Sequence, residues 1–136
     1  MTQGAVPRVL GVKLGAVRTS GSPALEIEVS IETAPSVLWD ALIVFGTADK
    51  SHPLVASGHA KEFLKDQYRH CKPILVLGTA QSLLAAAGIP AELPSKKPDP
   101  GLMVSPDIKG QRGLQEFVKA VAKHRHFERE TDPPRV

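Results

Sequence analysis

The chain has 136 residues, of which 42% are hydrophobic and 23% charged, and this composition is typical of one soluble globular domain. A single cysteine excludes an internal disulfide and fits a reducing compartment, so we expect a cytoplasmic protein. The net charge of +3 comes from basic and acidic residues that are interspersed, which gives no indication of nucleic-acid binding. The apolar runs are far shorter than the roughly 20 residues of a membrane helix, so we expect no membrane partner.

The N-terminal third predicts short strands joined by turns. Residues 1–8 lack periodicity and predict a flexible lead-in, while the apolar residues 9–12 predict a short buried strand. In residues 25–32 apolar side chains alternate with glutamate and serine, which predicts one half-exposed strand in an antiparallel pair or at a sheet edge. Residues 34–40 predict a turn or a short helix.

Two apolar segments in the middle of the chain share one pattern. Residues 41–45 and 74–77 each lead into Gly-Thr-Ala, and the segment between them, 58–70, has helical periodicity. This spacing predicts parallel neighbouring strands joined by a helix. The residues that would meet at the carboxyl edge of the sheet, a common place for ligands, form a possible pocket: Gly46, Thr47, Gly78 and Thr79. Turn geometry alone is the simpler explanation of the two glycines.

The rest of the chain continues the alternation of strands and helices. We predict a helix over 80–87 that ends at Gly88, a proline-rich loop over 89–100, a short strand at 102–104 and a helix over 111–126. Residues 131–136 predict a polar tail. This order predicts an α/β fold with a mostly parallel sheet. No helix is expected before residue 35, so the chain is similar to a doubly wound domain that lacks its first strand–helix unit, or to a smaller relative of such a domain.

Few side chains suggest chemistry. Cys71 precedes a strand, whereas a nucleophilic cysteine would stand at the turn after it, where this chain has Gly78, so we interpret Cys71 as structural. His124 and His126 are two apart on the predicted helix and would lie on different faces, which favours a solvated basic helix end over a metal site. We therefore expect no catalytic, cofactor-binding or metal-ligating residue.

Four segments carry a resemblance to a known family: residues 33–42, 68–74, 99–102 and, most specifically, the ending Ala-Lys-His-Arg-His-Phe-Glu-Arg-Glu at 122–130. They resemble the C-terminal domain of large-subunit haem catalases, over a predicted domain of residues 9–130. The resemblance implies a flavodoxin-like, three-layer sandwich akin to class I glutamine amidotransferases and PfpI-type proteins. That domain opens with the strand–helix unit missing here.

The resemblance also implies a function. We expect a non-catalytic accessory domain that stabilises a large catalase, the parent enzyme that dismutates hydrogen peroxide to water and oxygen. Its partners would be the catalase core domain, which holds the haem, and a homotetramer. We expect no cofactor in this chain and no activity from it alone. The alternative is a free-standing PfpI-type domain that binds or hydrolyses a small molecule at the strand ends.

Overall fold

The computed structural model describes residues 4–19, 22–46, 53–106 and 111–136. Its centre is a three-stranded parallel sheet in the order β5 (Leu42–Val44), β6 (Ile74–Leu77) and β7 (Leu102–Ser105). The prediction of parallel neighbours at 41–45 and 74–77 is therefore confirmed. These strands are apolar without alternation because layers of helix cover the sheet from two sides.

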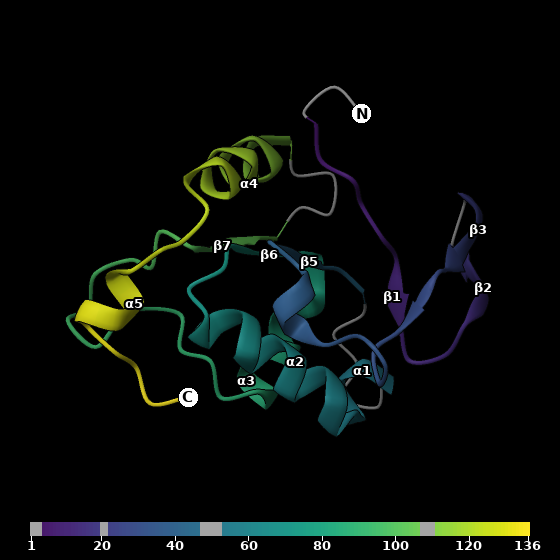
Figure 1. The fold of residues 1–136 in the computed structure, drawn as a ribbon, viewed down its shortest axis with the longest axis horizontal. Coiled ribbons are helices and arrows are strands. Elements are labelled where there is room, and N and C mark those ends of the chain that lie inside the picture. Colours follow the sequence, from purple (N-terminus) through teal and green to yellow (C-terminus); the bar gives the residue numbers. More distant parts are fainter. Residues whose placement is uncertain (1–3, 20–21, 47–52, 107–110) are drawn as a thin grey trace.

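Helices lie on both sides of this sheet (Figure 1). One layer contains α1 (Pro53–Ala56), α2 (Gly58–Arg69) and α3 (Gln81–Ala86), and α4 (Gln111–Lys123) lies on the opposite face. The main hydrophobic core lies under the first layer, where apolar residues of α2 and α3 pack on β6. This arrangement confirms the predicted α/β three-layer class with a mostly parallel sheet.

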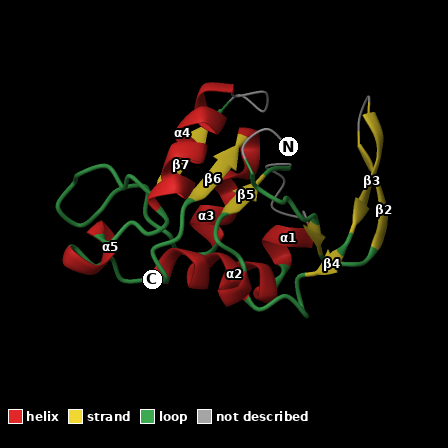
Figure 2. Ribbon diagram, turned by 45° about the horizontal axis from the view of Figure 1, so that its top comes forward, coloured by secondary structure: helices red, strands yellow, loops and turns green. Residues whose placement is uncertain are grey.

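The N-terminal strands lie apart from the central sheet. β1 (Leu10–Gly11) pairs in parallel with β4 (Val29–Ser30). β2 (Gly15–Thr19) and β3 (Ser22–Ile27) form an antiparallel hairpin that extends away from the helices and the parallel sheet (Figure 2).

The single strand predicted for residues 25–32 is wrong in its continuity. It divides at Glu28, before which the chain pairs with β2 and after which it pairs with β1. The period-two pattern is confirmed over residues 25–29, where Leu25, Ile27 and Val29 are half-buried and the intervening glutamates are exposed, but it fails at the half-buried Ser30. Alternation reports which face is buried, and it does not show whether the residues form one strand or two consecutive ones.

The segment 34–40 contains a short 3₁₀ turn, η1 (Ser36–Leu38), as predicted. The other predicted helices agree with the structure except at one place. The helix predicted over 111–126 ends early, at Lys123, because His124 adopts a left-handed backbone with φ 71°. The chain then turns into the short helix α5 (Glu128–Thr131). His126 is buried, so the prediction of a solvated basic helix end is wrong for this residue.

The last residues return to the body of the domain. The guanidinium group of Arg69, at the end of α2, donates hydrogen bonds of 2.8 and 3.1 Å to the Val136 carbonyl oxygen. The Val136 side chain packs against the main core. Within the described ranges, no helix combines the length and the apolar character needed to cross a membrane.

Candidate functional site

The carboxyl ends of β5 and β6 meet, as the pattern of the two strands predicts. The hydroxyl of Thr79 donates a 2.7 Å hydrogen bond to the carbonyl oxygen of Gly46. Gly78, with φ 61°, opens the 3₁₀ turn η2 (Gly78–Ala80), and Thr47 lies outside the described residues. The cavity beside these residues has a volume of about 10 Å³, which suffices for about one water. A pocket at the strand ends thus stays a prediction.

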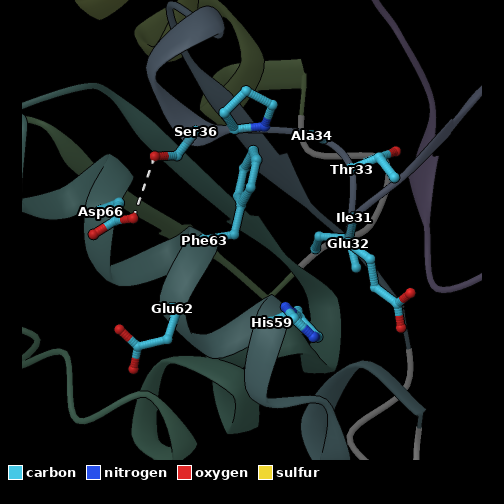
Figure 3. Close-up of a pocket in the computed structure, with 10 residues that line it drawn as sticks. Ile31, Glu32, Thr33, Ala34, Ser36, His59, Glu62, Phe63 and Asp66 are labelled. Carbon is cyan, nitrogen blue, oxygen red and sulfur yellow. Dashed lines mark hydrogen bonds between the residues drawn. The ribbon is translucent and has the colours of Figure 1, made fainter.

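A larger hollow, of about 270 Å³, lies between the segment that precedes η1 and helix α2 (Figure 3). Three carboxylates and one imidazole give it an acidic character. It is lined by Ile31, Glu32, Thr33, Ala34, Pro35, Ser36, His59, Glu62, Phe63 and Asp66.

The polar groups of this hollow do not form a reactive arrangement. The Ser36 hydroxyl donates to the carboxylate of Asp66 over 3.5 Å, so it is not directed at His59 as a nucleophile would be. Lys65 donates a hydrogen bond to Glu62 and lowers the pKa of that carboxyl. In Figure 3, Glu32 and Glu62 point away from each other. No group of three or more potential metal ligands gathers anywhere in the described residues.

The most elaborate polar arrangement is buried. The Arg129 guanidinium, on α5, donates a 2.7 Å hydrogen bond to the Asp99 carboxylate, and both side chains are at most 2% exposed. The same guanidinium donates to the carbonyl oxygens of Tyr68 (3.1 Å) and Lys72 (2.8 Å). It also lies 4.2 Å from the centre of the Tyr68 ring. One side chain therefore links α5, the loop before β7, the end of α2 and the start of β6.

Two further buried groups extend this network. The ammonium group of Lys72 donates to the carbonyl oxygens of Ser36 (2.9 Å) and Val37 (3.1 Å), and burial lowers its pKa. The His126 backbone N–H donates to the Cys71 carbonyl oxygen over 2.8 Å, while burial lowers the pKa of its imidazole. We call Tyr68, Lys72, Asp99, His126 and Arg129 the polar clamp.

The polar clamp joins the four segments that carry the family resemblance, 33–42, 68–74, 99–102 and 122–130. Sequence reasoning missed it, because Lys72 looked like the edge of an apolar strand and Arg129 like part of a charged ending. The sequence signal that could have revealed the clamp was the Asp-Pro-Gly at 99–101 together with that ending. Neither of the hollows described above is lined by any clamp residue, so the clamp acts on the fold.

Cys71 lies beside the clamp and is unsuited to nucleophilic chemistry. Its side chain is 1% exposed, and burial, followed by the nearby Glu130 carboxylate, raises the pKa of the thiol. A thiol of this kind is protonated at neutral pH and inaccessible to substrate. Burial and the raised pKa agree with the structural interpretation of Cys71, which stays a prediction.

A parallel sheet with helices on both faces defines the class of flavodoxin-like α/β domains. The crystal structure of a ThiJ/PfpI family protein from Pseudomonas syringae shares this fold with a TM-score of 0.62 and 15% sequence identity, over 95% of this chain and 64% of that one. The particular family follows from the sequence: the profile of the C-terminal domain found in long catalases matches residues 1–131. The chain belongs to this family.

Curated relatives agree with this assignment. The chain is 33% identical to Catalase HPII of Pseudomonas putida over 124 residues, which cover 91% of the chain and 16% of that relative. It is 33% identical to Catalase HPII of Mycobacterium avium over 137 residues, covering 96% and 19%. It is 27% identical to Catalase-1 of Neurospora crassa over 146 residues, covering 94% and 20%. The chain thus spans at most about a fifth of these relatives.

The described residues do not fit a haem. The phenol of Tyr68 is the type of group that can ligate haem iron, but burial and the Asp99 charge raise its pKa to about 12. The Arg129 cation lies against its ring rather than an apolar space. The larger hollow is acidic and, at about 270 Å³, below the roughly 300–1,000 Å³ of ordinary cofactor sites.

Proposed function

We propose that this chain is a non-catalytic accessory domain that stabilises a large catalase. The observation that carries the proposal is the polar clamp. Buried residues from each of the four segments that resemble the family bond to one another inside the fold, where they hold these segments in one geometry. Polar residues used in this way support a rigid structural body.

The chemistry of the parent enzyme then belongs to the remaining four-fifths or more of the catalase chain. That part would bind haem and dismutate hydrogen peroxide, and it would be the partner of this domain within a homotetramer. A cytoplasmic location is part of the same proposal and is supported by the single, buried and unpaired Cys71.

The alternative, a PfpI-type hydrolytic domain, gains no support from the site. The turn after β6 has Gly78 where a nucleophile would stand, and the thiol of Cys71 is buried at the opposite end of that strand. Among the described residues, the cavity beside the strand ends has a volume of about 10 Å³, which suffices for about one water.

A domain exchange in a full-length enzyme tests the proposal. In Catalase HPII of P. putida, the region aligned with this chain is either deleted or replaced by residues 1–131. We expect deletion to lower the temperature at which half of the peroxide-dismutating activity is lost, and the replacement to restore it. The rate per haem should be the same in all forms, because no residue of this domain touches the reaction.

The matched control is a replacement domain carrying Arg129→Ala, in which the polar clamp is broken. It should restore less of the inactivation temperature than the unaltered domain does. Equal inactivation temperatures for the intact and the deleted enzyme would contradict a stabilising role. A rate per haem that falls with the domain would contradict a non-catalytic one.

A further inference from the structure

The 3₁₀ turn η1 presents two large apolar side chains to solvent. Val37 is 61% exposed, and Leu38, at 72%, is the most exposed large apolar side chain among the described residues. A 3₁₀ helix has three residues per turn, so the burial of Ser36 beside α2 directs the next two side chains outward. Polar residues would satisfy the fold equally well at these two positions. The local fold therefore does not account for the apolar character of Val37 and Leu38.

Two buried side chains hold the backbone of η1 in place. The Lys72 ammonium group, in a residue that is 2% exposed, donates to the carbonyl oxygens of Ser36 and Val37 over 2.9 and 3.1 Å. The side-chain amide of the buried Gln67 donates to the carbonyl oxygens of Ser36 and Trp39. Burying an ammonium group costs desolvation free energy, and here its hydrogen bonds fix one exposed turn. A turn fixed in this way loses little conformational freedom when a partner binds it.

The acidic hollow continues from η1 along α2. Residues 31–36 form one wall of it and α2 forms the other, with the ring of Phe63 between them (Figure 3). Two of its three carboxylates, both on α2, have ion pairs within that helix, whereas Glu32 has none with any described residue. A hollow lined by carboxylates and an aromatic ring suits the head of a lysine or arginine side chain, whose stem is apolar.

We call Val37, Leu38 and the acidic hollow beside them the η1 surface. We propose that the η1 surface is the contact between this domain and the core domain of a large catalase. Val37 and Leu38 would enter an apolar depression of the core domain, and a cationic side chain of the core domain would enter the hollow. The inference rests on the proposed function, because a domain that stabilises a catalase shares a surface with the rest of that enzyme.

The charge of the η1 surface favours the core domain over a second copy of this chain. A two-fold contact between two η1 surfaces would bring the acidic hollows of both copies to one interface, and like charges disfavour that arrangement. The relatives contain the other partner. The matched region is 16% of one Catalase HPII and 19% of another, so most of each chain lies outside it. Charge complementarity then requires a basic side chain beside an apolar depression on that larger body.

The first measurement follows a cysteine on η1 in the exchange enzyme, which is P. putida Catalase HPII with residues 1–131 of this chain in place of its aligned region. Val37→Cys should react at once with a maleimide in the 136-residue chain. In the exchange enzyme we expect this reaction to slow by about tenfold or more, because an enclosed side chain is reached only when the contact opens. Leu14→Cys, at a position 66% exposed before β2, is the matched control and should react equally fast in both. Mass spectrometry of the labelled peptides assigns each reaction to its site.

The second measurement is the temperature at which the exchange enzyme loses half of its activity. Leu38→Asp should lower it, and so should Glu32→Lys, which reverses a charge in the hollow, while the unfolding temperature of the 136-residue chain stays unchanged. The matched controls are Leu14→Asp and Glu26→Lys, which change exposed residues outside the η1 surface and should leave the inactivation temperature unchanged. Arg129→Ala differs from all four, because breaking the polar clamp lowers both temperatures.

Four results would overturn the inference. They are equal labelling of Val37→Cys in the chain and in the exchange enzyme, an inactivation temperature that Leu38→Asp leaves unchanged or Leu14→Asp lowers equally, an exchange enzyme no more stable than the deleted form although deletion destabilises the P. putida enzyme, and a dimer of the 136-residue chain that Leu38→Asp dissociates. The dimer would assign the η1 surface to a second copy. Failure of the proposed function is a separate result, because it is measured on the intact and deleted P. putida enzymes, which carry no η1 substitution.

Discussion

The base of the central sheet, which is the end where β6 begins, and the β5 side of the sheet differ in the kind of side chain that each one buries or exposes. At the base, where β6 begins, the polar clamp buries charged groups and gives them partners from distant segments. Along β5, apolar side chains and backbone groups face outward. The comparison teaches that buried polar residues from the segments that resemble the family hold the domain itself together, whereas the β5 side leaves apolar side chains such as Ile43 and Phe45 exposed.

Breaking the polar clamp should have the largest effect. Arg129→Ala leaves the Asp99 carboxylate buried without its cation, and we expect a loss of about 3–5 kcal/mol in the free energy of unfolding, measured by urea denaturation. The control is Arg112→Ala, which removes an exposed ion pair with Glu116 and should cost less than about 0.5 kcal/mol. A similar loss in both variants would contradict the role of the clamp.

Crowding the clamp should have the next largest effect. A Cβ on Gly101 would lie 2.6 Å from Arg129 Nη2 and 2.8 Å from His126 Cγ. Gly101→Ala should therefore cost about 1–3 kcal/mol of unfolding free energy in the same measurement. Gly58→Ala is its control, because a Cβ there meets nothing within 4 Å at the start of α2. An unchanged stability in Gly101→Ala would show that the side chains of Arg129 and His126 can shift to accommodate the added methyl group.

Acid should lower the stability of the domain by protonating His126, which lies in the polar clamp. Burial is the main cause of its lowered pKa, Lys123 and Arg129 lower it further, and the Ala120 carbonyl and Glu128 oppose the shift. The folded state then binds fewer protons than the unfolded state. The free energy of unfolding should thus fall as the pH drops below about 6.5, by at most about 1.4 kcal/mol per pH unit.

Urea titrations between pH 7.5 and pH 5 measure this slope. His126→Gln should flatten it, whereas the exposed His124, replaced by asparagine, should leave it unchanged. The carboxyls of Glu62 and Glu128 have a pKa lowered from 4.5 and titrate below this window. An unchanged slope in His126→Gln would assign the pH dependence to other groups.

The smallest expected effect is the labelling rate of the Cys71 thiol, which reports how well the region beside the polar clamp excludes reagents. This measurement needs no substitution of Cys71. Because this thiol is 1% exposed with a raised pKa, a maleimide reagent should label it only at the rate of unfolding. A cysteine placed at Val37, which is 61% exposed on η1, should react at once as a control. Fast labelling of Cys71 in the folded chain would reopen the hydrolytic alternative.

Much of the fold follows from local patterns. The continuous apolar runs of β5 and β6 predicted buried parallel strands, and the spacing of Ala60, Phe63 and Leu64 predicted α2, since burial and periodicity are set by neighbours along the chain. The end of α4 could not be predicted this way. No breaker marks His124, and the chain turns there because His126 bonds to Cys71 far away in sequence.

The candidate sites, like the fold, were predicted from the sequence only in part. Strand order predicted that Gly46 and Thr79 would meet, but the size of the cavity beside them depends on how α1 and α3 pack. The polar clamp was invisible as a unit, because Lys72, Asp99 and Arg129 are separated by tens of residues and each looks like an ordinary surface charge.

The sequence by itself determined the class of fold, the parallel pairing of β5 and β6, and the family, because these depend on local apolar patterns and on short motifs. Only the tertiary structure decided what the motifs do. Burial of Arg129 against Asp99 arises from segments brought together from across the chain, and so does the difference in exposure between Leu75 of β6 and Ile43 of β5. A charge becomes a structural element or a surface group according to the neighbours that folding gives it.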